Sequence, residues 1–349
     1  MQAALLYGKE DLRVHEMPIP EIQENEVLLQ VKTAFVCGTD VRMFRNGHKG
    51  VSEESPLILG HELSGVIHKV GRRVKGYHEG QRVSVAPNMG CGMCELCISG
   101  NTQLCTQDFK ALGINIHGGF AEYVRVPEAA VRQGNMMVIP EQMSFDEAAI
   151  VEPLSCAYHG FTKCPTVPGD TVLIIGAGPI GLMHARLAKM VGAAKIFMHD
   201  VSENRLALCR QLEVSCITLD ASLPLPAQIT DVTHGRGVNL VITACAVPQV
   251  QTVALEVAAL NGKILFFGGL PAGKSVVGLD TNLIHYKQLL ITGMTRSSLA
   301  QYQKTINLIA DGLITVTDLI TSRAKLEDIH QTIQDVSHGI GLKSAISFD

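Results

Sequence analysis

The first third of the chain mixes apolar and polar residues in short runs with partial alternation, the pattern of half-buried β-strands. Glycine and proline residues bound these runs, and four of them predict strands at 26–36, 63–71, 81–87 and 120–127. Short strands with turn residues at this density are typical of a barrel-like sheet. We therefore expect a β-rich first domain.

The pattern changes near residue 150, where buried runs begin to alternate with runs of helical spacing. Strands are predicted at 170–178, 195–200, 239–246 and 263–270, and helices at 179–193, 202–213 and 249–260. Strands and helices alternating at this interval predict a parallel sheet covered on both faces. The tail predicts helices near 300–311 and 325–337 and a strand at 343–348, and we expect it to return to the first domain.

Composition narrows the class of protein. A length of 349 residues suits two domains, and a net charge of −4 implies no general basic surface for nucleic acid. The chain has no tryptophan, so base-stacking platforms are not expected. The N-terminus lacks the pattern of a secretory signal, and no apolar stretch is long enough to span a membrane. Ten cysteines in such a chain favour a reducing, cytoplasmic compartment.

Four of the ten cysteines lie close together at the spacing C-x2-C-x2-C-x7-C: Cys91, Cys94, Cys97 and Cys105. Four thiolates can close a tetrahedron around zinc, and Gly90, Gly92 and Gly100 give the backbone freedom to curl around it. Chance clustering or two disulfides are the alternatives, but no secretory context supports disulfides. A closed four-thiolate site has no open position for substrate, so we expect this zinc to be structural.

A G-x-G-x-x-G motif follows a predicted strand and opens a predicted helix: Gly176-Ala177-Gly178-Pro179-Ile180-Gly181. This context predicts a dinucleotide site, in which Gly176 makes the tight turn and Gly178 admits the pyrophosphate. Gly181 then lets helix and strand pack closely. Asp200 ends the next strand, where it would bind the ribose hydroxyls and repel a 2′-phosphate, so NAD is favoured over NADP. Arg205 either packs against the adenosine or is a solvated helix charge.

Residues 268–275 also fit the phosphate-loop pattern G-x-x-x-x-G-K-S and follow a predicted strand. A phosphate loop needs a helix that begins at its lysine. The following VVGLDTN is rich in β-branched residues and glycine, which start helices poorly. We therefore favour the first motif as the nucleotide site.

Six segments occur in an order that resembles a known family: CGTD (37–40), GHELSGVI (60–67), the four-cysteine run, GGFAEYV (118–124), VEPLSCAYHG (151–160) and GAGPIGL (176–182). Over its full length the chain resembles the zinc-containing medium-chain alcohol dehydrogenases. Within that family it is most similar to the polyol branch of sorbitol, xylitol, threonine, butanediol and galactitol-phosphate dehydrogenases.

The resemblance implies an α/β protein with a doubly wound parallel sheet of the Rossmann type and a GroES-like, barrel-type catalytic domain. Residues 1–153 and 291–349 would form the catalytic domain, with a structural zinc lobe at 90–106. Residues 154–290 would form the NAD-binding Rossmann domain. The resemblance also suggests a homotetramer, or failing that a dimer.

The resemblance further implies that Cys37, His61 and Glu152 hold a catalytic zinc, giving two zinc ions per chain together with NAD. In parts of this branch the glutamate after the histidine is the ligand instead, so Glu62 is an alternative. Zinc would polarise the substrate hydroxyl, hydride would pass to the nicotinamide, and Thr39 would take the hydroxyl proton.

The onward proton relay is less defined by the resemblance. Arg42 stands where the family often has a relay histidine, so the proton must continue through the ribose, water or another group such as His48.

The expected reaction is oxidation of a secondary alcohol to a ketone in a polyol, sugar alcohol or sugar-alcohol phosphate. The segment 44–50 is polar and basic, which suits a phosphorylated or carboxylated substrate at the entrance, or else a solvated loop. The alternatives are a threonine-type amino-alcohol or small-diol dehydrogenase, and a non-catalytic binding or structural protein that keeps the fold.

Overall fold

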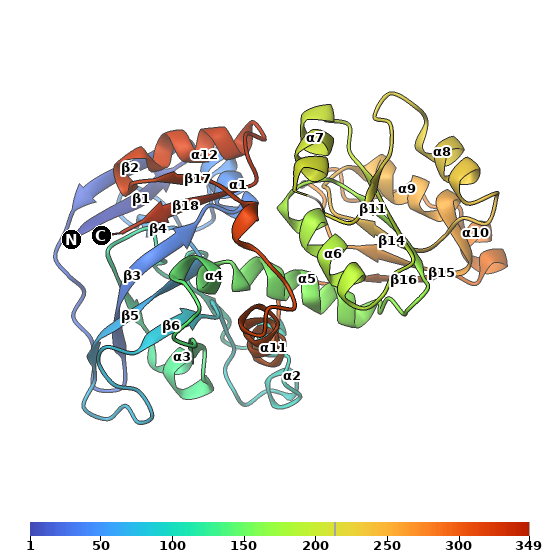
Figure 1. Cartoon of the computed structure of the whole chain (residues 1–349). Coiled ribbons are helices and arrows are strands. Elements are labelled where there is room, and N and C mark those ends of the chain that lie inside the picture. Colours follow the sequence, from blue (N-terminus) through green and yellow to red (C-terminus); the bar gives the residue numbers. More distant parts are fainter. Residues whose placement is uncertain (213, 349) are drawn as a thin grey trace. The chain divides into compact units, whose positions relative to one another are not determined.

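The computed structural model describes residues 1–212 and 214–348, and the chain divides into two compact units (Figure 1). The first unit contains Met1–Ser155 and the segment from Arg296 to the end of the chain, and the second contains Cys156–Thr295. The boundaries expected from sequence lay at 153/154 and 290/291. Each unit is described below by itself.

The first unit is built on a seven-stranded sheet in the order β10-β6-β5-β3-β18-β17, with β9 also paired to β3. Its strands are β3 (Val27–Phe35), β5 (Glu62–Val70), β6 (Arg82–Val85), β9 (Tyr123–Val126), β10 (Met136–Val138), β17 (Ile320–Ala324) and β18 (Lys343–Ser347). The end of the chain returns to this sheet, because Ala345 of β18 lies opposite Phe35 of β3 in an antiparallel pair.

Two smaller sheets and seven helices complete this part of the chain. The smaller sheets contain β1 (Gln2–Gly8), β2 (Asp11–Glu16) and β4 (Leu57–Ile58), and β7 (Asn88–Met89) with β8 (Lys110–Ala111). The helices are α1 (Gly38–Asn46), α2 (Glu95–Ile98), α3 (Glu128–Gln133), α4 (Phe145–Ala149), α11 (Leu299–Ala310), α12 (Ile329–Ser337) and α5 (Val151–Lys163), of which α5 continues beyond Ser155 into the second unit. The helix α12 packs on the sheet through fully buried Ile329 and Ile333.

The second unit is a six-stranded parallel sheet in the order β13-β12-β11-β14-β15-β16, flanked by helices (Figure 1). Its strands are β11 (Thr171–Ile175), β12 (Lys195–His199), β13 (Ile217–Thr218), β14 (Val238–Thr243), β15 (Ala258–Phe266) and β16 (Leu290–Gly293). Its helices are α6 (Pro179–Met190), α7 (Glu203–Gln211), α8 (Leu225–Val232), α9 (Pro248–Val257) and α10 (Thr281–Lys287). The strand order reverses beside β11, as in doubly wound dinucleotide-binding sheets, which confirms the predicted fold class.

The structure corrects some predicted element boundaries. The helix predicted at 249–260 ends at Val257, because Ala258 is extended (φ −69°, ψ 140°) and pairs with Val238 of β14. The helix predicted at 202–213 spans Glu203–Gln211, and residue 213 lies outside the described residues. Within the described residues 274–280 no helix follows Lys274, so the segment lacks the helix that a phosphate loop requires.

No helix in the described part of the chain is both long enough and apolar enough to cross a membrane.

Candidate functional site

A three-residue group of metal-binding type forms where β3 ends and β5 begins. The two strands pair antiparallel with Phe35 opposite Glu62. Cys37 lies just beyond β3, and His61 lies just before β5, so the register brings both to one edge of the sheet. The ligand atoms of Cys37, His61 and Glu62 all lie within 4.8 Å of one another. A thiolate, an imidazole and a carboxylate are a ligand set that suits zinc.

Gly60 fixes the backbone that presents His61. Its φ of 90° lies in the left-handed region, and a Cβ there would lie 2.7 Å from the Phe120 ring. Any other residue would therefore be strained and would displace a fully buried phenylalanine. The glycine before the histidine is thus a requirement of local geometry.

Asp40 contacts two of the three metal-ligand candidates, Cys37 and His61, a role that the sequence analysis missed. Its Oδ2 accepts a hydrogen bond from the Cys37 backbone N–H (2.9 Å), and its Oδ1 lies 3.4 Å from His61 Nδ1. This contact leaves His61 Nε2 to bind a metal, as carboxylate-oriented histidines do. Burial opposes a charge on His61, but the negative charges of Asp40 and Cys37 outweigh burial and raise its pKa well above the ordinary value. The spacing of Asp40, three residues after the helix cap Cys37, was the available signal.

Lys343 is a second participant that sequence analysis did not single out. Its Nζ donates to Glu62 Oε2 and also to the Val36 carbonyl oxygen (3.2 Å), in a pair whose side chains are 5% and 0% exposed. Burial disfavours the ammonium charge, but the attraction of Glu62, followed by those of Cys37 and Glu152, raises the pKa of Lys343. Glu62 Oε1 has no hydrogen-bond partner among the described residues, so this buried oxygen is free to bind a metal.

The other predicted catalytic residues take different positions. Glu152 begins α5, is 7% exposed, and is not part of the 4.8 Å group formed by Cys37, His61 and Glu62. Its charge nevertheless acts on Lys343, so both carboxylates influence the same lysine. Thr39 lies in the first turn of α1 and is partly exposed, and Arg42 is exposed on the same helix.

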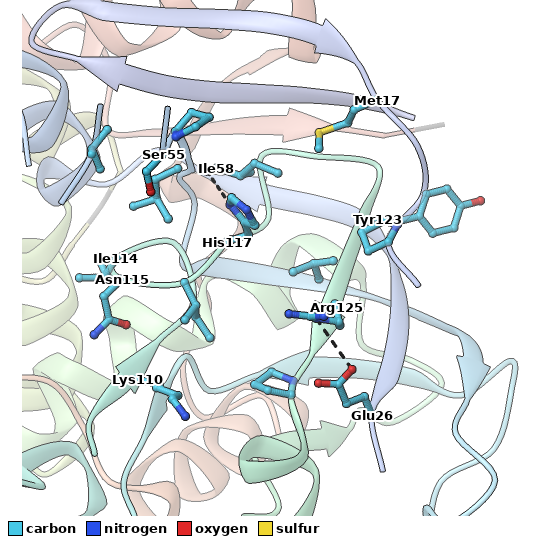
Figure 2. Close-up of a pocket in the computed structure, with 18 of the residues that line it drawn as sticks. Met17, Glu26, Ser55, Ile58, Lys110, Ile114, Asn115, His117, Tyr123 and Arg125 are labelled. Atoms are coloured by element: carbon cyan, nitrogen blue, oxygen red, sulfur yellow. Dashed lines mark hydrogen bonds and ion pairs between the residues drawn. The ribbon is translucent and has the colours of Figure 1, made fainter. Parts of the chain in front are cut away.

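A cavity of about 1080 Å³ opens elsewhere in the first unit (Figure 2). Its lining includes His48, Lys49 and Gly50 from the predicted basic segment, together with Lys110. By contrast, Phe44 of that segment is buried in the last turn of α1. The part of the segment that faces the cavity is therefore residues 48–50.

Two interactions organise this cavity. His117 Nδ1 accepts a hydrogen bond from the Ile58 backbone N–H (3.2 Å), and Arg125 lies 3.8 Å from Glu26 (Figure 2). Burial, and then the charge of Arg125, lower the pKa of His117, so this imidazole stays neutral at neutral pH.

The four predicted lobe cysteines come together at β7, α2 and the segment that follows. Cys91 Sγ lies 3.9 Å from Cys97 Sγ, and Cys94 Sγ lies 3.9 Å from Cys105 Sγ. Zinc–sulfur bonds of about 2.3 Å give tetrahedral edges of roughly 3.8 Å, so the sulfur atoms fit one zinc ion. Backbone N–H groups also point at the sulfurs. Burial opposes ionisation of Cys105, but the N–H groups of Cys91, Asp108 and Gln107 outweigh it and lower its pKa to about 6.

The lobe is fixed to the rest of the first unit by two side chains, Gln133 and Arg296, and by close packing at Gly90. A Cβ on Gly90 would overlap Cys97 Sγ, so glycine is needed there. Gln133 of α3 pairs with the Gly90 backbone through Nε2 (2.6 Å) and Oε1 (3.3 Å). Arg296 donates to the Gln103 carbonyl oxygen (3.0 Å) and stacks over Phe109 at 4.2 Å.

The glycine motif of the second unit connects β11 to α6. Gly176 has a φ of 116°, and Gly178 is the extended cap residue of α6. A Cβ on Gly181 would overlap the Gly176 carbonyl oxygen, so helix and turn can approach this closely only with glycine. The first turn of α6 therefore presents free backbone N–H groups of the kind that bind phosphate.

Asp200 closes this turn from the end of β12. Its carboxylate accepts hydrogen bonds from the backbone N–H groups of Ala177 (2.8 Å) and Ser202 (2.9 Å). Arg205 of α7 is half-buried beside it, and its Nη1 is buried without a hydrogen-bond partner among the described residues. Burial lowers the pKa of Arg205, and the charge of Asp200 opposes that shift. Arg205 Nη1 could therefore donate a hydrogen bond to a nucleotide bound next to Asp200.

Comparison with known proteins agrees with this geometry. Residues 23–136 match the alcohol dehydrogenase GroES-like domain, and residues 179–311 match the zinc-binding dehydrogenase domain. The chain is 30% identical to sorbitol dehydrogenase of Bacillus subtilis, over 96% of this chain and 93% of that protein. It is 35% identical to L-threonine 3-dehydrogenase of Bacillus velezensis, over 90% of this chain and 89% of that protein.

The fold is also similar to those of solved structures. An alcohol dehydrogenase from Escherichia coli CFT073 in complex with NADH superposes with a TM-score of 0.89 at 28% identity, covering 100% of this chain and 99% of that one. This family uses zinc and a nicotinamide cofactor. The first unit has two groups of residues that could bind zinc, and the second unit has a glycine motif of the kind that binds a dinucleotide. The chain belongs to the zinc-binding alcohol dehydrogenase family, of the GroES-like, medium-chain type.

Proposed function

We propose that this dehydrogenase oxidises a secondary alcohol of a polyol, sugar alcohol or sugar-alcohol phosphate to a ketone, with zinc and NAD. The group of Cys37, His61 and Glu62 is the observation that carries the proposal, because it supplies a partly open zinc site in the GroES-like unit. The sorbitol dehydrogenase relative supports the substrate class. When bound, zinc acts as a Lewis acid on the substrate hydroxyl, and NAD accepts hydride.

The protein's own residues would perform the remaining work. Cys37 and His61 hold the metal, with Asp40 fixing the ring of His61 and the backbone of Cys37. Thr39, in the first turn of α1, accepts the proton of the substrate hydroxyl at its Oγ1. Arg42 is exposed and cannot serve as the histidine-type relay, so the proton leaves through water, the cofactor ribose or His48.

We propose that a carboxylate is the third zinc ligand, and two residues compete for this role. Glu62 has one oxygen bound by Lys343 and one free, whereas Glu152 lies outside the ligand group and near the same lysine. We propose that Glu152 is the ligand while Glu62 stays paired with Lys343, and that Glu62 takes its place when that pair opens. Substituting each glutamate by glutamine and measuring bound zinc distinguishes the two.

The proposal of an anionic group on the substrate rests on His48, Lys49 and Lys110, which line a cavity that Glu21 and Glu26 also line and that the zinc-ligand candidates do not. Cationic side chains of this kind bind phosphate and carboxylate. We propose that residues 48–50 lie at the substrate entrance. A screen for NADH production should then rank polyol phosphates and sugar acids above neutral polyols, and Lys49→Met should remove that preference.

In the second unit, Gly176–Gly181 and Asp200 are proposed to hold NAD. Asp200 is negatively charged at the ribose position, so it would repel the additional phosphate of NADP. Arg205 would contact the adenosine ribose, which gives its unpaired Nη1 a partner. Asp200→Ala should therefore reduce the preference for NAD, and an unchanged NAD-to-NADP ratio would contradict the assignment.

We also propose a cytoplasmic homo-oligomer, a tetramer or else a dimer. The second unit supports self-association, since β16 is an edge strand and α10 has no buried residue. Val276, Tyr286 and Leu290 are exposed to 98%, 76% and 53% there, which is unusual for large apolar side chains. The free cysteines support a reducing compartment.

The test of the whole proposal combines metal analysis with a substrate screen. Purified protein should contain about two zinc ions per chain, and Cys37→Ser should lose one of them together with turnover while keeping its fold. NADH production should be screened over polyols, polyol phosphates, sugar acids, diols and amino alcohols. Preferred turnover of L-threonine would favour the amino-alcohol alternative, which the 35% identical threonine dehydrogenase supports. Failure to turn over any alcohol with zinc and NAD bound would favour a non-catalytic role.

A further inference from the structure

Two cysteines of the second unit lie in direct contact and have no part in the zinc or cofactor sites. Cys209 in the last turn of α7 and Cys216 just before β13 have their Sγ atoms 3.0 Å apart. The two sulfur–sulfur contacts of the zinc lobe, Cys91–Cys97 and Cys94–Cys105, are longer, at 3.9 Å. Both residues are free thiols, and no metal-binding group among the described residues includes them. A disulfide requires an S–S distance of about 2.05 Å, so the two sulfurs must approach by about 1 Å to bond.

The two sulfurs differ in their access to solvent. Cys209 is fully buried, whereas Cys216 lines a cavity of about 260 Å³. The same cavity is lined by Lys189 and Lys195. The hydrogen bond to Cys209, followed by burial, raises the pKa of Cys216, so this sulfur keeps its proton. Cys216 can therefore be reached by a small molecule in the cavity, and the buried Cys209 is in contact with it.

The hydrogen bond between the two sulfurs makes the buried Cys209 a base for the thiol of Cys216. The thiol of Cys216 hydrogen-bonds to Cys209, and together with Arg210 and Arg186 this contact lowers the pKa of Cys209. The same contact raises the pKa of Cys216, so Cys216 holds the proton of the pair and Cys209 is the sulfur that ionises first. A thiolate is the form of cysteine that reacts with oxidants.

We propose that Cys209 and Cys216 are a redox-modification site that forms a reversible disulfide with oxidants of the peroxide class. Cys216, reached through the cavity, passes its proton to the Cys209 thiolate as its sulfur attacks the O–O bond of hydrogen peroxide. Cys216 becomes a sulfenic acid, and the hydroxide that leaves takes a proton from solvent to give one water. The Cys209 sulfur then bonds to that sulfur and releases the second water. In total, two thiols are oxidised to one disulfide while one peroxide is reduced to two waters. A small-molecule dithiol reverses the step by thiol–disulfide exchange.

The link would close a short loop between α7 and β13. The helix α7 begins just after Asp200 and carries Arg205 in its first turn. In the oxidised form a disulfide at Cys209 would link the C-terminal turn of this helix to Cys216. We expect hydrogen exchange over Glu203–Gln211 to slow on oxidation, because the last turn of the helix can no longer open freely. This inference concerns thiols outside the zinc and cofactor sites and does not depend on the substrate.

Peptide mapping tests the proposal directly, because trypsin cuts after Arg205, Arg210 and Arg236. The two cysteines then fall in separate peptides, 206–210 and 211–236, which stay joined only through a disulfide. The zinc-loaded protein is treated with hydrogen peroxide, alkylated and digested, and zinc release is measured on the same sample. We expect the linked pair to form while zinc is retained and to disappear with dithiothreitol.

Three variants sharpen the test. Cys209→Ser should accumulate a sulfenic acid at Cys216 that dimedone traps, whereas Cys216→Ser should give neither the link nor the trapped acid in 206–210. Cys245→Ser, a partly exposed cysteine of the same unit, should form the link as the unmodified chain does. If both peptides remain alkylated in the unmodified chain, or if a link appears only after zinc loss or joins other cysteines, the proposal is wrong.

Discussion

Replacing Lys343 by methionine should strongly destabilise the first unit. The change removes the ammonium that pairs with Glu62 and the donor to the Val36 carbonyl, while the apolar stem of the side chain is roughly kept. Because the two side chains are only 5% and 0% exposed, water cannot replace the lost partner. Breaking one side of a buried ion pair costs about 3–5 kcal/mol. Out of a total stability of about 5–15 kcal/mol, such a loss is large.

The assay must report on the first unit alone, since a chain of two units need not unfold in one step. Native-state hydrogen exchange of peptides from β3 and β5 supplies the free energy of opening for that unit. Lys69→Met is the matched control, because it makes the same substitution at an exposed site on β5. That variant should change the free energy by no more than about 0.5 kcal/mol.

A double variant, Glu62→Gln with Lys343→Met, isolates the charge effect. Without the carboxylate no buried charge is left unpaired, so the double variant should be more stable than Lys343→Met by about 2 kcal/mol or more. A cost of Lys343→Met equal to that of Lys69→Met would refute the reasoning. If the cost appears only in zinc-free protein, zinc rather than Lys343 balances Glu62.

Three further predictions test other parts of the structure. Burial lowers the pKa of His184 to about 3 against an ordinary value of 6.5, so the unfolded chain binds the proton first and stability falls as pH drops from about 6.5 towards 3. His184→Phe should remove about 2 kcal/mol of the loss measured by urea unfolding at pH 5 relative to pH 7, and an unchanged loss would show that His184 is not the cause. Cys94→Ser should lose one zinc ion and lower the melting temperature, while the control Cys245→Ser retains both ions by elemental analysis. Gly181→Ala should weaken NADH binding in a fluorescence titration at least tenfold, since the new Cβ would meet the Gly176 carbonyl; equal affinity would contradict the packing role.

The sequence was sufficient for those features in which spacing alone determines chemistry. Four cysteines at short intervals can meet only by curling around a common centre, and they do so with a geometry that suits zinc. The glycine motif is equally local, because its constraints arise within one turn and one helix. Alternating strands and helices likewise predicted the parallel sheet of the second unit.

What escaped prediction depends on long-range pairing. Lys343 reaches Glu62 only because β18 lies against β3, and nothing in KSAISF distinguishes that lysine from a solvated one. The choice between Glu62 and Glu152 is of the same kind, since it depends on which carboxylate the fold brings to Cys37 and His61. Asp40 was visible as a helix-cap residue, but its contact with His61 comes from the register of β3 and β5.

The pairing of β18 with β3 also sets an order of events during protein synthesis. Glu62 and Lys343 are separated by 281 residues, and the entire second unit is made between them. A ribosome that adds about 5–20 residues per second needs roughly 15–60 s to cover that interval. During this time Glu62 of β5 has no lysine partner, and β3 still lacks its pairing with β18. A nascent chain that stalls before β18 is made would therefore hold all its candidate zinc ligands but lack the lysine that balances Glu62.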